Sequence, residues 1–397
     1  MWNSDDKRLV IVPNDPIALY VKGGFDSYLE GYFNPQGMFR EVFAISPLED
    51  REYQAFGMTI IPAPEGAVGS ILRDLSPGVV RAYGGGWTAD YACRHRVPNV
   101  PVVVSVHDTH SSMVRPSVRY ADLILCVSRA TQKEVLARGA SPKQIRLLPN
   151  RFDRDIFRPV TDQSAIDTIA RRFPPGKYIF QLGRKVHQKN LDTLIRALAL
   201  LPSEYACIFA GMGDAGDYIS LAKSLGVEKR CYWIDAIENS ELPLWHAWCD
   251  CYCMPSRWEG FSIALVEAAA CGAAIVASDI GPMRDLLTHD ESACLVKDYE
   301  DHLALAAAIQ KVCEDSMYRR KISSGAINAA EPFERSIIDG IEAAYYHEAI
   351  NMGPYQFSMK ARAKRYFWQK GGHAALDSIR GFLPHLARRV YRTGSRT

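Results

Sequence analysis

Short runs of β-branched and apolar residues alternate with helical patterns along the first part of the chain. The runs predict strands over residues 8–12, 41–45, 58–61, 78–83, 101–106, 123–127 and 145–148. Gly23 and Gly24 predict a turn, and a helix is expected over residues 25–33. Strands that alternate with helices indicate a parallel sheet covered on both faces.

A second series of the same kind follows a stretch rich in Pro, Asp and Arg over residues 149–176. Strands are expected over residues 178–182, 206–210, 231–234, 250–254, 274–277 and 293–296, with helices near 191–201, 218–225, 262–271 and 301–313. Doubly wound sheets bind ligands beyond the carboxyl ends of their strands. The pattern therefore predicts an α/β protein whose two Rossmann-like domains face each other across a cleft.

The length of 397 residues suits two such domains and leaves a remainder. We expect an N-terminal domain over residues 1–160 and a C-terminal domain over 161–335. Residues 336–397 would form a crossover helix and a basic extension, because 333–350 show a helical apolar pattern.

The charge is unevenly distributed. Residues 353–397 hold ten Lys and Arg against one acid, so the rest of this chain of net charge +2 is acidic. This distribution argues against a nucleic-acid partner. Aromatic residues interleave with the basic ones over 355–368. Residues 355–397 could contact an anionic membrane face, or they could form a packing extension with a solvated basic side.

The ten cysteines and the polar N-terminus predict a cytoplasmic chain with free thiols. Membrane contact through residues 355–397 would make it peripheral at the inner membrane face. Cys249, Cys251 and Cys253 alternate, which predicts that all three lie on one face of a buried strand. A zinc site more often has two intervening residues and a second ligand pair.

The segment from Pro255 to Ser262, continuing to Glu267, carries the clearest chemistry. Ser262 is an expected N-cap, and the helix N-terminus behind it offers amides to an anion. Gly260 permits close approach of a ligand to the backbone. Glu259 and Glu267 could accept hydrogen bonds from two sets of sugar hydroxyls. On spacing alone, an exposed loop acid and an ordinary helix acid fit as well.

This segment resembles the signature of retaining glycosyltransferases of family four (glycosyl transferases group 1), which have the GT-B fold. It has Pro-Ser, an aromatic residue, Glu-Gly-Phe and a second Glu eight positions after the first, and residues 267–281 continue the likeness. Residues 181–190 resemble the family's strand, Gly-Arg, loop and Lys. The resemblance covers residues 8–350 and is strongest over 178–290.

The resemblance implies a role for each matching residue. Arg184 and Lys189 would stabilise the diphosphate that leaves, where fixed cations favour the transition state. Glu259 would hold the donor sugar, Glu267 the ribose, and His107 would line the sugar pocket. His110 has no assigned role.

The remaining donor contacts are weaker. The loop after the first strand resembles the family's glycine loop, whose amides, here those of Gly23 and Gly24, would approach phosphate or sugar. Backbone and side chains of Gly260, Phe261 and Ser262 complete the donor site. Ile237 would pack on the base or be a plain core residue.

One residue departs from the family pattern. In residues 149–153, Arg151 stands where the family's linker has Gly. Either the loop conformation differs, since Arg does not readily adopt positive φ, or the position permits a side chain. A bulky cation near the cleft could then change acceptor recognition.

The resemblance implies a hexosyltransferase that moves sugar from a UDP- or GDP-sugar to a glycan or glycolipid acceptor. Front-face substitution would retain the anomeric configuration, with no metal or cofactor, and surface polysaccharide synthesis is the family's commonest setting. A nucleotide-sugar 2-epimerase of the same fold and a non-catalytic nucleotide-sugar-binding scaffold are the alternatives.

Overall fold

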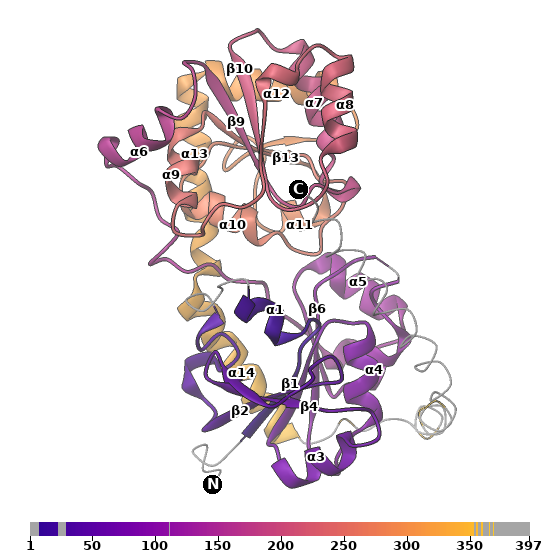
Figure 1. The fold of residues 1–397 in the computed structure, drawn as a ribbon. Coiled ribbons are helices and arrows are strands. Elements are labelled where there is room, and N and C mark those ends of the chain that lie inside the picture. The colour runs from indigo at the N-terminus through magenta and orange to yellow at the C-terminus, as the bar shows by residue number, and fades with distance from the viewer. Residues whose placement is uncertain are drawn as a thin grey trace.

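The computed structural model describes residues 8–22, 29–110 and 112–352, together with positions 355, 359, 365 and 368. These residues form two α/β domains, one above the other in Figure 1, and the long helix α14 (Arg335–Met352) returns from the second domain to the first. The expected GT-B architecture is confirmed.

The first domain is built on an eight-stranded sheet in the order β3-β4-β2-β1-β5-β6-β7-β8. Every neighbouring pair is parallel except β3 with β4. The strands are β1 (Arg8–Val12), β2 (Glu41–Ser46), β3 (Tyr53–Ala55), β4 (Met58–Pro62), β5 (Val79–Tyr83), β6 (Val102–Val106), β7 (Leu123–Cys126) and β8 (Ile145–Leu147).

Helices cover both faces of this sheet because the strand side chains alternate between two buried clusters. Val10, Val80 and Val104 belong to one cluster, whereas Leu9, Val79 and Val103 belong to the other, which also receives α14. The other helices are α1 (Ile17–Lys22), α3 (Val68–Leu75), α4 (Trp87–Arg94) and α5 (Arg129–Ala137).

The second domain has a parallel six-stranded sheet in the order β11-β10-β9-β12-β13-β14. Its strands are β9 (Lys177–Leu182), β10 (Tyr205–Ala210), β11 (Cys231–Ile234), β12 (Cys251–Met254), β13 (Ile275–Ser278) and β14 (Cys294–Val296). Its helices are α6 (Gln163–Ala170), α7 (Leu191–Leu200), α8 (Gly216–Ser224), α9 (Leu242–Trp248), α10 (Ile263–Ala270), α11 (Gly281–Arg284), α12 (His302–Glu314) and α13 (Ser316–Ala330).

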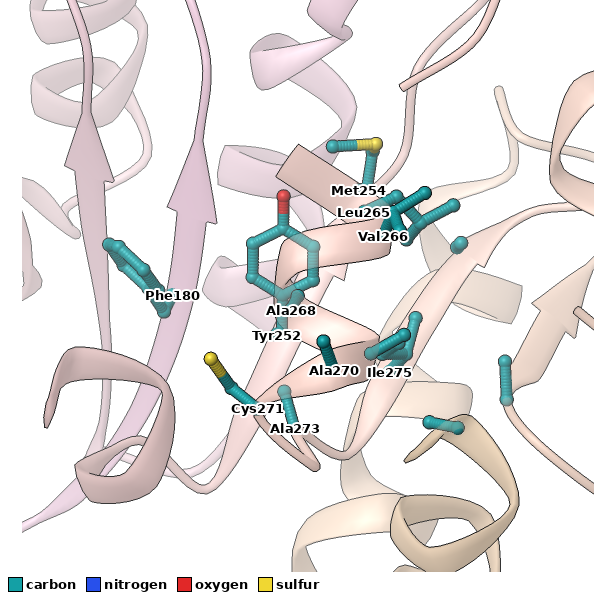
Figure 2. Packing of buried hydrophobic residues seen from close by; sticks show 14 of the residues in the cluster. Phe180, Tyr252, Met254, Leu265, Val266, Ala268, Ala270, Cys271, Ala273 and Ile275 are labelled. Carbon is teal, nitrogen blue, oxygen red and sulfur yellow. The ribbon is translucent and has the colours of Figure 1, made fainter. Parts of the chain in front are cut away.

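Small residues let α10 lie close to the sheet. Figure 2 shows Ala268 and Ala270 of α10 packed with Tyr252 and Ile275 of the neighbouring strands. Interiors pack densely, so this layer leaves α10 little freedom to shift. The N-terminal end of α10 is thereby fixed at the edge of the second domain that faces the first (Figure 1).

Two crossing segments join the domains and bond to each other. The N–H of Phe152 donates to the carbonyl of Phe333 (3.0 Å), and the N–H of Arg335 donates to the carbonyl of Phe152 (2.9 Å). Ion pairs of Arg154 with Glu331 and of Arg335 with Asp153 join the same segments. The linker and the start of α14 therefore form one connection.

Each strand expected from the hydrophobic pattern is present, and no strand end differs from its expected position by more than one residue. The prediction missed β3, which pairs antiparallel with β4 through a turn in which Phe56 and Gly57 both have positive φ. It also missed α6, which lies within the stretch taken for a plain connection.

The cysteine prediction was wrong in one respect. Cys251 and Cys253 are buried strand residues, but β12 begins at Cys251, and Cys249 instead caps the end of α9. All ten cysteines are free. Burial raises the pKa of Cys231 and Cys271 to about 12, so these thiols stay protonated at neutral pH.

Most of the basic extension lies outside the described residues. Of those described, Trp368 packs on Tyr120 (ring centroids 5.4 Å apart) and lies under the Arg94 guanidinium (5.0 Å), and the N–H of Tyr355 donates to Asp122 (2.7 Å). These contacts suit the packing interpretation of this segment. Among the described helices, none has the length and apolar character that a bilayer crossing requires.

Candidate active site

The loop before α10 places the two glutamates. The hydroxyl of Ser262 accepts a hydrogen bond from the N–H of Leu265 (3.3 Å), which confirms Ser262 as the N-cap. Glu259 lies in the loop before the cap and Glu267 lies inside the helix. Both side chains are buried.

Lys189 and Glu259 form an ion pair. The ammonium of Lys189 lies 2.6 Å from Oε1 of Glu259, and both side chains are largely shielded from solvent, with exposed fractions of 13% and 6%. Gln188 also approaches, donating to the carbonyl of Trp258 (2.9 Å) and to Glu259 (3.4 Å). The loop after β9 is thus bonded to the loop before α10, with a cation and a carboxylate in contact.

Arg257 locks this loop in place, a role that sequence reasoning missed. Its guanidinium bonds to both oxygens of Asp192 (3.1 and 2.9 Å) and to both oxygens of Glu300 (2.6 and 3.1 Å). Forked pairs of this kind fix orientation as well as distance. Arg257 therefore acts as an anchor that holds Trp258 and Glu259 in position.

Asn190 connects the loop after β9 to the loop before α10 and to the segment after β14. It adopts left-handed backbone geometry (φ 55°) and its amide donates to the carbonyls of Pro255 (2.9 Å) and Tyr299 (2.8 Å). Asn tolerates this conformation better than most residues. The only signal in the sequence was its position directly after Lys189.

The two neighbouring cations after β9 differ in surroundings. The side chain of Arg184 is exposed, whereas Lys185 is buried and donates to the carbonyls of Gly211 and Ile234 (3.1 Å for Ile234). Gly211 is required there because a Cβ on it would lie 2.2 Å from the carbonyl oxygen of Gly183. Lys185 is therefore a structural tie between the two loops, and Arg184 is the one that faces solvent.

Glu267 is a buried carboxyl that forms no ion pair with any of the described residues. Burial raises its pKa from an ordinary value of 4.5 to about 8. The free protein at neutral pH therefore holds Glu267 largely protonated. Hydroxyl donors from a ligand would stabilise the ionised form and reverse this shift.

His107 follows β6 and lies in the first domain opposite this loop. Its Nε2 lies 2.9 Å from the hydroxyl of Ser105, and its ring stacks on Tyr83 at 6.3 Å. Burial, with help from the Arg81 charge, lowers its pKa from 6.5 to about 4. His107 is therefore neutral at pH 7.

Gly260 brings the two domains into contact at His107. A Cβ on residue 260 would lie 1.8 Å from the carbonyl oxygen of His107 and 3.2 Å from Cα of Asp108. Only a residue without a side chain permits this approach. The loop that carries Glu259 therefore meets the backbone of His107, whereas the His107 imidazole lies in a small cavity of the first domain with Arg81, Tyr83 and Glu342.

An open groove of about 310 Å³ runs beside this contact. Its walls come from Trp258 and Glu259 on one side and from Thr109 and α5 on the other. Near it, the N–H of Arg129 at the start of α5 donates to Asp285 of the second domain (2.9 Å). This hydrogen bond is thus a second contact between the two domains near the groove.

The remaining predicted contacts are less well placed. The ring of Phe261 packs on Phe333 (5.6 Å), so only its backbone could reach a ligand. Ile237 is half-buried against the core of the second domain. Gly23 and Gly24 lie outside the described residues.

Arg151 does not point into the groove. Its guanidinium lies 2.7 Å from Glu342 and 2.9 Å from Asp339 of α14, and donates to the carbonyl of Tyr32 (2.6 Å). Arg151 is not among the described residues with positive φ. The loop therefore departs from the expected glycine conformation, and the side chain ties the linker to α14.

Within the described residues, no group of three His, Cys, Asp or Glu side chains is placed to hold a metal ion. The expectation that the chemistry needs neither metal nor cofactor stays a prediction.

Comparison with protein families gives matches to both halves of the chain. Residues 162–329 match the glycosyl transferases group 1 family, and residues 42–155 match Glycosyltransferase Family 4. The second domain is therefore similar to group 1 glycosyl transferases, and most of the first is similar to Glycosyltransferase Family 4. The matched regions include the Lys189–Glu259 pair in the second domain and His107 in the first.

Two curated proteins show how far the similarity extends. The D-inositol 3-phosphate glycosyltransferase of Xylanimonas cellulosilytica is 30% identical over 53% of this chain and 53% of the relative. The N-acetylgalactosamine-N,N'-diacetylbacillosaminyl-diphospho-undecaprenol 4-alpha-N-acetylgalactosaminyltransferase of Campylobacter jejuni is 28% identical over 59% of this chain and 64% of the relative. The matched segment thus spans 53% and 64% of these relatives.

Solved structures share the fold over nearly the whole described chain. Anabaena Alr3699/HepE in complex with UDP and glucose superposes with a TM-score of 0.71 at 19% identity, covering 86% of this chain and 99% of that one. This likeness supports the two-domain GT-B architecture.

Proposed function

We propose that this protein is a retaining glycosyltransferase that moves a hexose from a UDP- or GDP-sugar to a glycan or glycolipid acceptor. The observation that carries the proposal is the Lys189–Glu259 pair at the N-terminal end of α10, in a loop that meets the backbone of His107. A cation for phosphate and a carboxylate for sugar hydroxyls lie in contact, at a helix end that favours anions.

Each group has one task in the proposed reaction. Lys189 and Arg184 neutralise the diphosphate as the bond to the sugar breaks, and Glu259, freed from Lys189 by the donor, holds the sugar hydroxyls. Glu267 accepts from the ribose. His107, neutral, lines the sugar pocket. The leaving phosphate oxygen takes the acceptor proton, so substitution occurs on the face of departure and configuration is retained.

Support for the acceptor class comes from the relatives. The Campylobacter protein is named for transfer to a sugar linked to diphospho-undecaprenol. An acceptor of this class would fit a cytoplasmic enzyme at the inner membrane face in surface polysaccharide synthesis, which is the setting we propose. The epimerase and scaffold alternatives lack a specific observation in their favour.

The test is the fate of the donor. UDP-glucose, UDP-N-acetylglucosamine, UDP-galactose and GDP-mannose are each incubated with the protein, and proton NMR follows the first sugar released. A retaining transferase releases the α-anomer of the hexose first, with nucleoside diphosphate, even when water is the acceptor. First release of the β-anomer would contradict retention, and conversion to an epimeric donor would favour the isomerase.

A further inference from the structure

We propose that the groove between Trp258 and α5 binds a sugar ring of the acceptor. The proposal rests on the proposed function and adds to it the chemistry of the acceptor end. The groove has a volume of about 310 Å³ and is lined by Thr109, Ala130, Lys133, Glu134, Trp258 and Glu259, among others.

The groove is distinct from the place of the nucleotide. Arg184, Lys189, Ser262 and Glu267 do not line it, and Glu259 alone is common to the groove and the proposed donor contacts. A molecule in the groove would therefore lie next to the sugar that Glu259 holds, and away from the diphosphate and ribose. That is where an acceptor must be when its hydroxyl attacks the anomeric carbon.

The wall formed by Trp258 suits a sugar ring. A pyranose has one face of C–H groups, which carry partial positive charge, and an aromatic face is negative. The imidazoles of His110 and His187 lie beside the indole, with ring centroids 6.5 and 5.9 Å from its centroid. Gln188 fixes the Trp258 backbone at 2.9 Å, and the neighbouring Arg257 is locked between two carboxylates.

The opposite wall offers polar groups for the ring's hydroxyls. Lys133 is exposed on α5, and the carboxylate of Glu134 is fixed by Arg138 at 2.6 Å, with lone pairs left to accept. Thr109 adds a hydroxyl at the groove. A lipid chain cannot hydrogen-bond to these groups, whereas a saccharide can pack one face on a flat apolar wall and bond its hydroxyls to a polar rim.

His110, which had no role in the sequence analysis, lies beside one wall of this groove. It comes from the first domain and stands beside Trp258 of the second, so the platform is complete only when the domains are in contact. The groove is therefore formed in the same arrangement that brings Gly260 against His107.

The experiment measures sugar binding directly, without knowledge of the natural acceptor. Methyl α- and β-glycosides of glucose, galactose, mannose and N-acetylglucosamine are titrated against the full chain by saturation-transfer NMR in the presence of UDP or GDP. Variants are Trp258→Ala, Trp258→Phe and Lys133→Ala, with Lys297→Ala as an exposed control outside the groove.

We expect at least one glycoside to bind, with affinity about tenfold lower in Trp258→Ala and within about threefold of wild type in Trp258→Phe. Lys133→Ala should weaken binding and Lys297→Ala should not. Nucleotide affinity, measured on the same samples, should stay within about twofold in all four variants.

Glycoside binding that is equal in wild type and Trp258→Ala would overturn the groove assignment. So would nucleotide binding without any glycoside binding, and in that case the proposed function survives. Failure of every nucleotide to bind would instead count against the proposed function, whatever the glycosides do.

Discussion

Gly260 stands so close to His107 that a single added carbon would meet the carbonyl oxygen at 1.8 Å. The contact joins the loop that carries Glu259 to the strand end that carries His107. In the proposed function, this contact between the domains would help to exclude water from the site.

Gly260→Ala tests this contact. We expect transfer or donor hydrolysis to fall at least about tenfold, because the added methyl group forces the domains apart. Nucleotide affinity should change less than turnover, since the proposed phosphate and ribose contacts of Lys189 and Glu267 lie in the second domain. Gly66→Ala, which meets nothing within 4 Å, is the control and should keep full activity. Equal turnover in both variants would show that closure does not depend on the contact.

The Lys189–Glu259 pair predicts a stability effect that is separate from activity. Lys189→Met leaves a buried carboxylate without its cation, and we expect a loss of about 3 kcal/mol in the free energy of unfolding. Adding Glu259→Gln should restore most of that stability while activity stays lost. Denaturant titration measures the free energy of unfolding of the single and the double variant, with Lys297→Met, an exposed site, as control. A Lys189→Met protein as stable as the control would mean that the ion pair does not contribute to the stability of the fold.

Glu267 predicts a pH dependence of nucleotide binding. Its pKa of about 8 falls when ribose hydroxyls donate to the carboxylate, so binding releases a proton below pH 8. Affinity for the nucleotide should therefore rise from pH 6 to pH 8. Calorimetry in buffers of different ionisation enthalpy counts the proton. Glu267→Gln should release none, and an unchanged proton count in that variant would refute the assignment.

The same carboxyl affects folding stability with a defined sign. The folded-state pKa of Glu267 lies above its unfolded value, so its stabilising contribution is complete below about pH 4.5 and is lost as pH rises toward 8. Thermal unfolding of Glu267→Gln should therefore match wild type near pH 5 and exceed it at pH 8.5. A constant difference between the two across this range would argue that the carboxyl is not desolvated.

His107 should leave no mark on the pH–rate profile above pH 5. Its pKa of about 4 keeps the imidazole neutral there, so it can hydrogen-bond a sugar but supplies no proton at pH 7. His107→Gln should lower turnover while the profile between pH 5.5 and 8 keeps its shape. An acidic limb near pH 6.5 that vanishes in this variant would assign it a titrating role.

The sequence predicted the elements far better than the contacts between them. Apolar runs of β-branched residues marked the parallel strands, because strands buried on both faces are nearly continuous in apolar residues. The short β3 had no such run, since it is a half-exposed edge strand. The turn at Phe56 could not be predicted, because Phe rarely adopts positive φ and its presence does not indicate a turn.

Within the site, motif spacing located Glu259 and Glu267 but not their partners. Arg257 bonds to Asp192 and Glu300, which are far apart in the chain and meet only because β9 and β14 end at the same edge of the sheet. Arg151 bonds to Glu342 across 191 positions for a similar reason. Long-range charge pairs of this kind leave no periodic pattern in one sequence.

The central claim is that a nucleotide diphosphate binds between Lys189 and Glu267, and calorimetric titration of UDP, GDP and ADP tests it most directly. The account predicts that one of the three binds with micromolar affinity, and that Lys189→Met and Glu267→Ala each weaken binding at least about tenfold, whereas Gly66→Ala leaves it unchanged. Binding of none of the three, or binding that neither substitution alters, would contradict the site and with it the proposed function.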